Sequence, residues 1–199
     1  MKDAAGTRTR ILDGALVGFA GNGYGATSLD SLAGGLGLRK QTILHHFGTK
    51  EGLLGAVVDR SAAELAEALE EGLARAGPGF ARVEEVVRAT FRLAARRPEL
   101  LSLLREVSRL GPPTATRLVE VLDPLVVRAG GFLEDEMGAG RMRRHDPRLL
   151  LLTAYSTVIG AATEVEVLRS VGVEPTARTL VRRRAELIAF LRSALVATP

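Results

Sequence analysis

The stretch that decides the fold is residues 27–50, which read TSLDSLAGGLGLRKQTILHHFGTK. Apolar residues recur in it every three or four positions, and this spacing predicts two short helices. We expect Thr27 to be the N-cap of the first helix, with Asp30 three residues later completing a capping box. Gly37 ends that helix, and the second helix runs over about residues 39–47. Two short helices joined by a glycine turn are the ingredients of a helix-turn-helix.

The outward face of the second short helix follows from its apolar positions. Ile43 and Phe47 lie one turn apart and point into the core, which leaves Gln41 and His45 on the opposite side. The N-terminal turn of such a helix approaches base edges in the major groove of DNA. Arginine or lysine can donate hydrogen bonds to guanine, glutamine can pair with adenine, and the threonine methyl group can touch thymine. This turn consists of Arg39, Lys40, Gln41 and Thr42.

A long helix is expected to follow from Lys50 to about Ala76, with Thr49 as its N-cap. Lys50 lies at the positive N-terminal end of this helix, where it can hold a phosphate and fix the register on DNA. The candidate DNA-contacting residues are Thr27, Ser28, Arg39, Lys40, Gln41, Thr42, Leu44, His45, His46 and Lys50.

The rest of the chain is also expected to be helical. No stretch alternates with a period of two, so we predict an all-α fold with about nine helices. The first helix carries Ile11 and Phe19 on its apolar stripe and ends at residues 21–23. From Gly77 onward, glycines and prolines divide the chain into five helical stretches.

Composition places the chain among ordinary globular proteins. Of its 199 residues, 46% are hydrophobic and 25% are charged, and none is cysteine, which excludes disulfides, thiolate catalysis and cysteine-bound zinc. The first 50 residues hold six Lys and Arg against three Asp, whereas the rest hold 21 Lys and Arg against 20 acidic residues. This asymmetry predicts that the N-terminal segment meets a polyanion such as nucleic acid.

The sequence indicates a cytoplasmic protein without a membrane partner. The N-terminus, MKDAAGTRTR, has no apolar signal core, so we expect no secretion through a cleaved signal. The longest uncharged run, residues 149–163, has 15 residues, and about 20 apolar residues are needed to span a bilayer. We interpret this run as a helix buried in protein.

Neither a metal centre nor an enzyme active site is expected. His45 and His46 are adjacent, so they point in different directions on a helix, and no HExxH spacing is present. With three histidines, no cysteine and acidic residues spaced as on a helix surface, no acid, base and nucleophile converge. We expect no cofactor either.

A longer sequence pattern extends from Arg8 to Val58 without an insertion or deletion. It comprises Arg10-Ile11-Leu12, Ala15, Phe19, Gly23-Tyr24, Thr27-Ser28-Leu29, Leu32-Ala33, Gly37-Leu38, Thr42, His46-Phe47, Lys50-Glu51 and Leu53-Leu54. This pattern resembles the DNA-binding domain of the tetracycline-repressor (TetR) family, over about a quarter of the chain.

Three residues depart from the family's pattern. Leu44 stands where the family usually has a tyrosine that binds phosphate, so we expect that contact to be absent. Arg39 stands where a small hydroxyl residue is common, which removes a helix cap and places a cation at the groove. Gln41 replaces a frequent glycine and adds a side chain that can read a base.

The resemblance implies two domains and a homodimer. A helix-turn-helix DNA-binding domain would span residues 5–65, with the motif at about 28–47, and a ligand-binding and dimerisation domain would span 66–199. The last two helices of each subunit would form a four-helix bundle. Either a symmetric partner or the chain's own core could bury the apolar run 149–162 and the stripe Leu180, Leu187, Leu191 and Leu195.

The resemblance also implies an inducer pocket in the C-terminal domain. Its candidate lining is almost entirely apolar, so a mainly apolar small molecule is the expected effector. The same side chains are also typical of plain core. The candidates are Phe91, Leu104, Val107, Leu122, Val126, Tyr155 and Ile159.

These expectations describe a homodimeric transcriptional regulator, most often a repressor in this family, which a small apolar molecule releases from a palindromic operator. Its partners would be double-stranded DNA, the effector and a second copy of the chain. The alternative is an all-α ligand-binding or scaffolding protein whose helix-turn-helix has lost specific DNA binding, which Leu44 and the uncapped Arg39 leave open.

Overall fold

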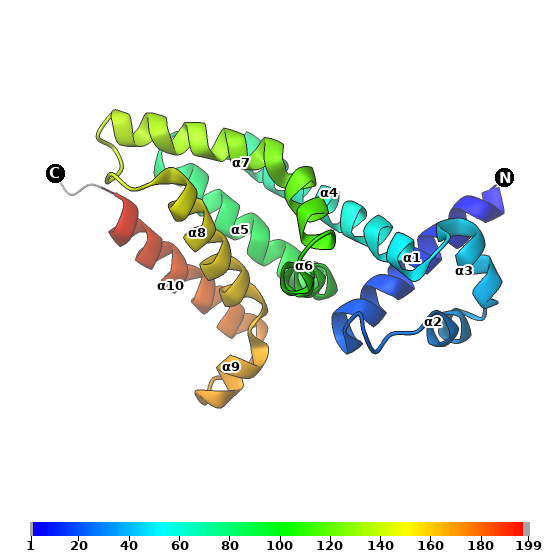
Figure 1. The fold of residues 1–199 in the computed structure, drawn as a ribbon. Helices are drawn as coiled ribbons and strands as arrows, with labels where there is room; N and C mark the ends of the chain where they lie inside the picture. Colours follow the sequence, from blue (N-terminus) through cyan, green and yellow to red (C-terminus); the bar gives the residue numbers. More distant parts are fainter. Residues whose placement is uncertain (1, 197–199) are drawn as a thin grey trace. The chain divides into compact units, whose positions relative to one another are not determined.

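The computed structural model describes residues 2–196, and it describes the side chains of residues 5–164 and 167–196. Over this range the protein consists of α-helices without a strand, which confirms the all-α prediction (Figure 1). Ten helices form rather than about nine, because the stretch that starts at Pro147 is broken at Glu164. The helices are α1 (Lys2–Asn22), α2 (Leu29–Leu36), α3 (Lys40–Phe47), α4 (Lys50–Arg75), α5 (Phe80–Arg96), α6 (Pro98–Leu110), α7 (Thr114–Gly138), α8 (Pro147–Thr163), α9 (Val165–Ser170) and α10 (Ala177–Leu195).

The helices group into two compact units. The first unit consists of the chain up to Glu64 together with Glu99–Val121, and the second consists of Leu65–Pro98 together with the chain from Leu122 onward. Helix α6 therefore belongs, from Glu99, to the same unit as the helix-turn-helix.

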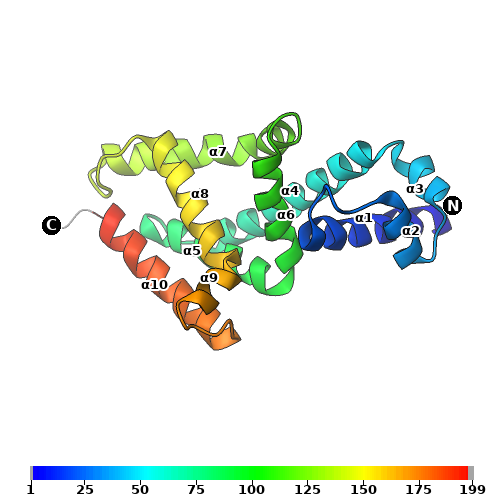
Figure 2. The ribbon, with the colours of Figure 1, turned by 60° about the horizontal axis from the view of Figure 1, so that its bottom comes forward.

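In the first unit, α1 packs against α2 and α2 packs against α3 (Figure 2). Ile11 and Phe19, predicted to lie on the apolar stripe of the first helix, are fully buried. Gly18 allows α2 to approach α1 closely, because an ideal Cβ there would lie 2.9 Å from Leu32 Cδ2 and 3.1 Å from Thr27 Cγ2.

The residue that caps α2 is Ser28, whose Oγ accepts a hydrogen bond from the Ser31 amide at 3.0 Å. The expectation that Thr27 is the N-cap is wrong. Thr27 is buried, and the single proton of its hydroxyl is shared between the carbonyl oxygens of Gly18 (2.9 Å) and Gly23 (2.8 Å). A buried hydroxyl must find its partner inside the contact with α1, so it does not face the free amides of α2.

The ends of α2, α3 and α4 follow the predicted signals. Gly37, with a φ of 65°, ends α2 in the left-handed region. Arg39 occupies the N-cap position of α3, and its side chain makes no capping hydrogen bond, as expected from its chemistry. Thr49 caps α4, since its Oγ1 accepts a hydrogen bond from the Gly52 amide at 2.9 Å.

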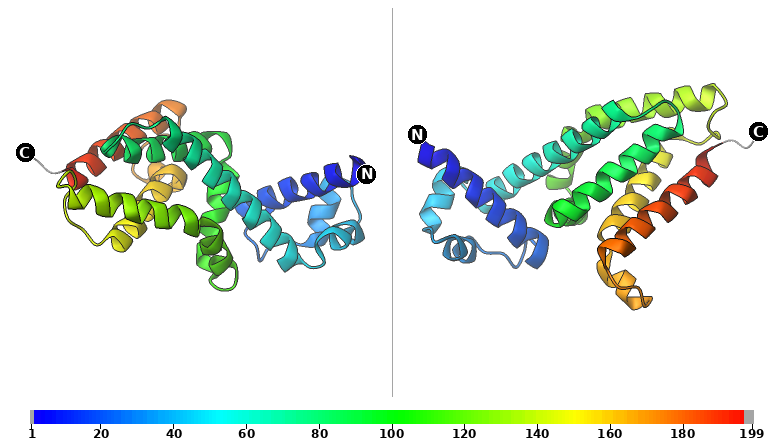
Figure 3. Two further views of the ribbon diagram at one scale, coloured as in Figure 1. Left: turned by 90° about the horizontal axis from the view of Figure 1, so that it is seen from above. Right: turned by 180° about the vertical axis from the view of Figure 1, so that it is seen from behind.

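In the second unit, α5, α8 and α10 pack against one another (Figures 1 and 3). Helix α8 begins at the predicted signal: the carboxylate of Asp146 accepts hydrogen bonds from the amides of Arg148 (2.9 Å) and Leu149 (3.1 Å), and Pro147 is the first helical residue. The core cluster of this unit comprises Phe80, Val87, Phe91, Leu133, Met137, Met142, Val158, Leu187, Leu191 and Leu195.

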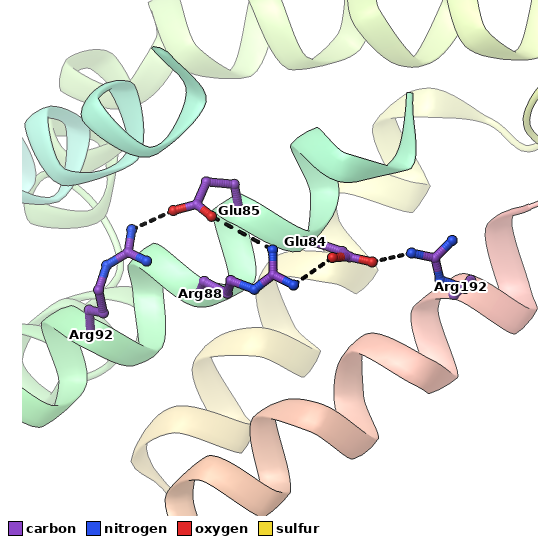
Figure 4. A network of polar contacts seen from close by, with 5 residues as sticks. All are labelled: Glu84, Glu85, Arg88, Arg92 and Arg192. Atoms are coloured by element: carbon purple, nitrogen blue, oxygen red, sulfur yellow. Dashed lines mark hydrogen bonds and ion pairs between the residues drawn. The ribbon is translucent and has the colours of Figure 1, made fainter. Parts of the chain in front are cut away.

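A network of ion pairs joins α5 to α10 (Figure 4). Glu84 accepts hydrogen bonds from Arg88 at 2.6 Å and from Arg192 of α10. Glu85 accepts one from Arg92 at 2.6 Å and also pairs with Arg88 at 3.8 Å. Both carboxylates are mostly buried, so this pairing compensates their loss of hydration and holds α10 along α5.

Helices α8 and α10 expose large apolar side chains. Leu149 is 64% exposed, and Leu152 and Phe190 are each 61% exposed. Interpreting residues 149–163 as a helix buried in protein is therefore wrong for the single chain. No helix in the described range is nonetheless long and apolar enough to cross a membrane. The predicted α10 stripe lies in the chain's own core instead, with three of its members buried: Leu187, Leu191 and Leu195.

Candidate DNA-binding site and ligand cavity

The outward face of α3 is oriented as the sequence predicts. Ile43 is fully buried, whereas Gln41 and His45 are exposed on the other side of the helix. Arg39 and Lys40, at the start of the helix, are also exposed. Because Ile43 fixes the rotation of α3, its N-terminal turn presents two cations and an amide to solvent. The flanking candidates Thr42, Leu44 and His46 are half-buried.

Lys40 is tied to the preceding helix. Its Nζ donates a hydrogen bond to Oδ2 of Asp30 in α2 at 2.8 Å, and both side chains are largely exposed. This pair links the two helices of the motif across the glycine turn. Such a pair in high dielectric is weak, so Lys40 remains available to a stronger anion.

Two arginines of α1 contact the last residues of α2 and α3. The Nη2 of Arg10 donates a hydrogen bond to the carbonyl oxygen of Leu36, the last residue of α2, at 2.9 Å. The guanidinium of Arg8 lies 5.2 Å from the ring centroid of Phe47, the last residue of α3. Both arginines act at C-terminal ends of helices, where positive charge is favoured.

Lys50 binds its own chain. Its Nζ donates to the carbonyl oxygen of Tyr24 at 2.6 Å and lies 4.2 Å from the centroid of the Tyr24 ring. The ammonium thus holds the loop before α2 against the first turn of α4. This role of Tyr24 could not be predicted from the sequence, since nothing local connects two residues this far apart along the chain.

The Tyr24 hydroxyl completes this junction. It donates a hydrogen bond to Oε1 of Glu51 at 3.0 Å. Burial, together with the hydrogen bond and charge of Glu51, raises the pKa of Tyr24 to about 12. Hydrogen bonds from a backbone amide, from Tyr24 and from Thr49 lower the pKa of Glu51 below its ordinary value.

The second unit contains a cavity of about 690 Å³ lined by residues of α4, α5, α7, α8 and α10 and open to solvent on one side. Its lining is dominated by aliphatic side chains, with Phe132 and Tyr155 as its aromatic members. This volume lies within the range of small-molecule sites. The lining residues are Leu65, Leu69, Glu70, Leu73, Ala74, Arg82, Val83, Val86, Val87, Thr90, Leu122, Leu125, Val126, Arg128, Ala129, Phe132, Leu133, Leu150, Leu151, Ala154, Tyr155, Val158, Ile159, Leu191 and Leu195.

The structure brings together four of the seven candidate ligand-binding residues: Leu122, Val126, Tyr155 and Ile159 line the cavity. The other three do not line it. Phe91 is buried in the core cluster of the same unit, and Leu104 and Val107 are buried in α6, which belongs to the first unit. Apolar periodicity identifies a buried face, but it cannot tell a filled core from the wall of a cavity.

Three charged side chains line the cavity. Arg128 of α7 donates a hydrogen bond to Oε1 of Glu70 in α4, and both lie at exposed positions. Arg82 of α5 is also exposed and places its guanidinium 5.4 Å from the centroid of the Phe132 ring. Thr90 donates its hydroxyl proton to the carbonyl oxygen of Val86. Apart from these groups, most of the residues that line the cavity are apolar.

The fold and the exposed face of α3 define the class of helix-turn-helix DNA-binding regulators. The family described as "Bacterial regulatory proteins, tetR family" matches residues 11–57. The chain is 31% identical, over 175 residues, to the HTH-type transcriptional repressor AcnR of Corynebacterium glutamicum, covering 79% of this chain and 85% of AcnR. The chain belongs to the TetR family of bacterial transcriptional regulators, whose members are regulators and not enzymes.

Solved structures share the fold at lower identity. A regulator from Saccharomonospora viridis in complex with choline superposes with a TM-score of 0.77 at 19% identity, covering 98% of this chain and all of the other. The regulator FadR from Bacillus subtilis in complex with stearoyl-CoA gives a TM-score of 0.75 at 20% identity, covering 92% of this chain and 96% of FadR. At this identity the likeness concerns the fold alone.

Proposed function

We propose that the protein is a cytoplasmic, homodimeric repressor that binds a palindromic operator through α3 and is released by a mainly apolar ligand in the cavity. The observation that carries the proposal is the N-terminal turn of α3. Arg39, Lys40 and Gln41 are exposed together there, while Ile43 anchors the helix in the core. A repressor with two-fold symmetry reads two equivalent half-sites, so its operator is a near-palindrome.

The candidate residues divide into those that suit contacts with DNA and those that stabilise the helix-turn-helix itself. Arg39 and Gln41 suit base contacts, since a guanidinium matches guanine and an amide matches adenine, and Thr42 can touch a thymine methyl group. His45 and His46 lie further along α3 and, with Leu44, contact the flank of the site. Lys40 supplies charge to the phosphate backbone.

The second group consists of residues whose side chains form hydrogen bonds with the backbone of the same chain. Thr27 and Lys50 donate hydrogen bonds to backbone carbonyl oxygens, and Ser28 caps α2. These three act mainly by fixing where α2 and α3 lie. Lys50 therefore affects DNA affinity through the geometry of the motif, and any phosphate it meets is secondary.

Dimerisation is supported by the faces that α8 and α10 leave open. Leu149, Leu152 and Phe190 are exposed apolar side chains on two helices that pack side by side. Exposed apolar surface of this kind marks an interaction site. A second copy, related by a two-fold axis, covers both faces with the same residues and forms a four-helix bundle.

The cavity supports a small-molecule effector. Relatives of the same fold are described in complex with stearoyl-CoA and with choline, so this architecture accommodates ligands of both kinds. The present cavity favours an aliphatic chain. A quaternary ammonium is recognised by a cage of aromatic faces, whereas here Phe132 and Tyr155 stand among aliphatic residues and Arg82 covers Phe132.

Selection from random duplex DNA tests the proposal. Purified protein should enrich a near-palindrome, and its affinity should fall steeply with salt, because several phosphates are neutralised on binding. Enrichment without any sequence preference would show DNA contact but no base reading by α3. Absence of DNA binding, from protein freed of bound ligand, would replace the proposal with that of an all-α ligand-binding protein.

A further inference from the structure

The charged side chains that line the cavity include one more positive than negative group. Among the described residues that line it, Glu70, Arg82 and Arg128 are charged. Arg128 and Glu70 are bound to each other and neutralise one another. The guanidinium of Arg82 forms no hydrogen bond or ion pair with the described part of the chain, so its donors are free while its face rests on Phe132.

The neighbours of Arg82 do not use its donors. Glu136 is close enough for the charge of Arg82 to contribute to lowering its pKa, but its two oxygens are held by Arg141 at 2.7 and 2.8 Å. Arg82 lies in the first turn of α5, whose N-cap Gly79 offers no side-chain cap. The buried carboxylate of Glu136 already lies at this end of the helix, 3.9 Å from an ideal Cβ at Gly79, so the free donors of Arg82 are what remains for a ligand.

We propose that the cavity binds an amphiphile with an aliphatic body and a single carboxylate head, and that Arg82 binds the head. This inference rests on the proposed function, in which the cavity is the effector site. A planar guanidinium matches a carboxylate in a bidentate geometry. One unmatched positive charge suits one carboxylate, whereas a coenzyme A thioester would bring several phosphates and a quaternary ammonium would be repelled.

Calorimetry with four probes of equal chain length tests the proposal: decanoate, decanol, decyltrimethylammonium and decanoyl-CoA. We expect the wild-type protein to bind decanoate about tenfold or more tightly than decanol, and the other two more weakly than decanoate. Arg82→Gln should remove this preference and leave decanol binding unchanged. Arg82→Lys should keep part of it. Arg144→Gln, an exposed arginine that does not line the cavity, is the matched control and should change nothing.

Two results would overturn the inference about the head group. Equal binding of decanoate and decanol by the wild type would show that no group reads the carboxylate. Equal weakening of both probes by Arg82→Gln would show a structural role, which the melting temperature of the free variant would also reveal. If none of the four probes bound, the cavity itself would fail as an effector site, and the ligand part of the proposed function would fall with it.

Discussion

Tyr24, Lys50 and Glu51 join the loop before α2 to the first turn of α4. Lys50 donates to the Tyr24 carbonyl oxygen at 2.6 Å, and the Tyr24 hydroxyl donates to Glu51 at 3.0 Å. Each contact links residues that are far apart in sequence, so together they fix the position of the helix-turn-helix relative to α4. A side chain that appears from sequence to be a phosphate ligand is thereby a structural residue as well.

Replacing Lys50 by Gln should weaken binding to all duplexes alike and also lower the melting temperature. The reason is the loss of a charge-assisted hydrogen bond, worth on the order of 1 kcal/mol at a half-exposed site. Thermal melting and binding to specific and random duplexes measure both effects. Lys40→Gln is the control: its Nζ makes only an exposed ion pair, so DNA affinity should fall without a change in melting. An unchanged melting temperature in Lys50→Gln would refute the structural role.

Tyr24 should ionise late. Its folded pKa is raised to about 12 from an ordinary value of 10.0, so the neutral hydroxyl stabilises the fold below pH 10 and that contribution is lost between pH 10 and 12. For Glu51 the folded pKa is lowered, so its contribution exists above its ordinary pKa and disappears as the pH falls through the folded value.

Tyrosinate absorbance in Tyr155→Phe, which leaves Tyr24 as the chain's remaining tyrosine, measures this pKa directly. Adding Glu51→Gln should lower it, because the carboxylate charge that opposes ionisation is gone. A midpoint near 10 in the Tyr155→Phe protein would show that the hydroxyl is not held by Glu51.

At the scale of the element, the junction of α3 and α4 depends on one glycine. An ideal Cβ at Gly52 would overlap with the carbonyl oxygen of Phe47, which is backbone and cannot rotate away. Gly52→Ala should therefore destabilise the protein by about 1–3 kcal/mol despite the better helix propensity of alanine. Denaturant unfolding measures the change. Gly34→Ala in α2 is the control, since nothing lies within 4 Å of its ideal Cβ; equal stability of the two variants would disprove the steric argument.

The short helices could be predicted from sequence because their signals are local. Apolar spacing, Gly37 and Thr49 determine where α2, α3 and α4 begin or end, and the structure agrees with them. The choice between Thr27 and Ser28 as N-cap could not be predicted. Both carry a hydroxyl, and the outcome depends on the contact of Thr27 with Gly18, which is set by the packing of α1 on α2.

The candidate sites likewise include features that the sequence predicts and features that only the structure shows. The orientation of α3 followed from the spacing of Ile43 and Phe47, whereas the partner of Lys50 lies in a distant loop and required the structure. For the cavity, periodicity indicated which faces are apolar, but Leu104 and Val107 pack in α6 of the other unit. Which apolar residues surround an empty volume depends on how helices pack, and no local pattern records it.

At the scale of the whole molecule, the exposed apolar faces of α8 and α10 predict a dimer. A charged residue introduced into these faces should disrupt it. Leu152→Glu should weaken dimerisation at least about 100-fold, because the two-fold axis places the change twice in the interface and each Leu burial contributes about 1.5–3 kcal/mol. Solution mass measured over a dilution series reports the effect. Val119→Glu, at an equally exposed apolar residue of α7, should leave the mass unchanged. A dimer that survives Leu152→Glu would place the interface elsewhere.

Base preference at the operator decides whether α3 reads DNA in the way proposed. Binding of the wild type and of Gln41→Ala should be compared over every single-base variant of the selected duplex, at one fixed salt concentration. We predict that Gln41→Ala changes the preference at one base pair of each half-site by about 1–3 kcal/mol and leaves the other positions as they were. A preference profile identical to that of the wild type would contradict base reading by the exposed turn of α3.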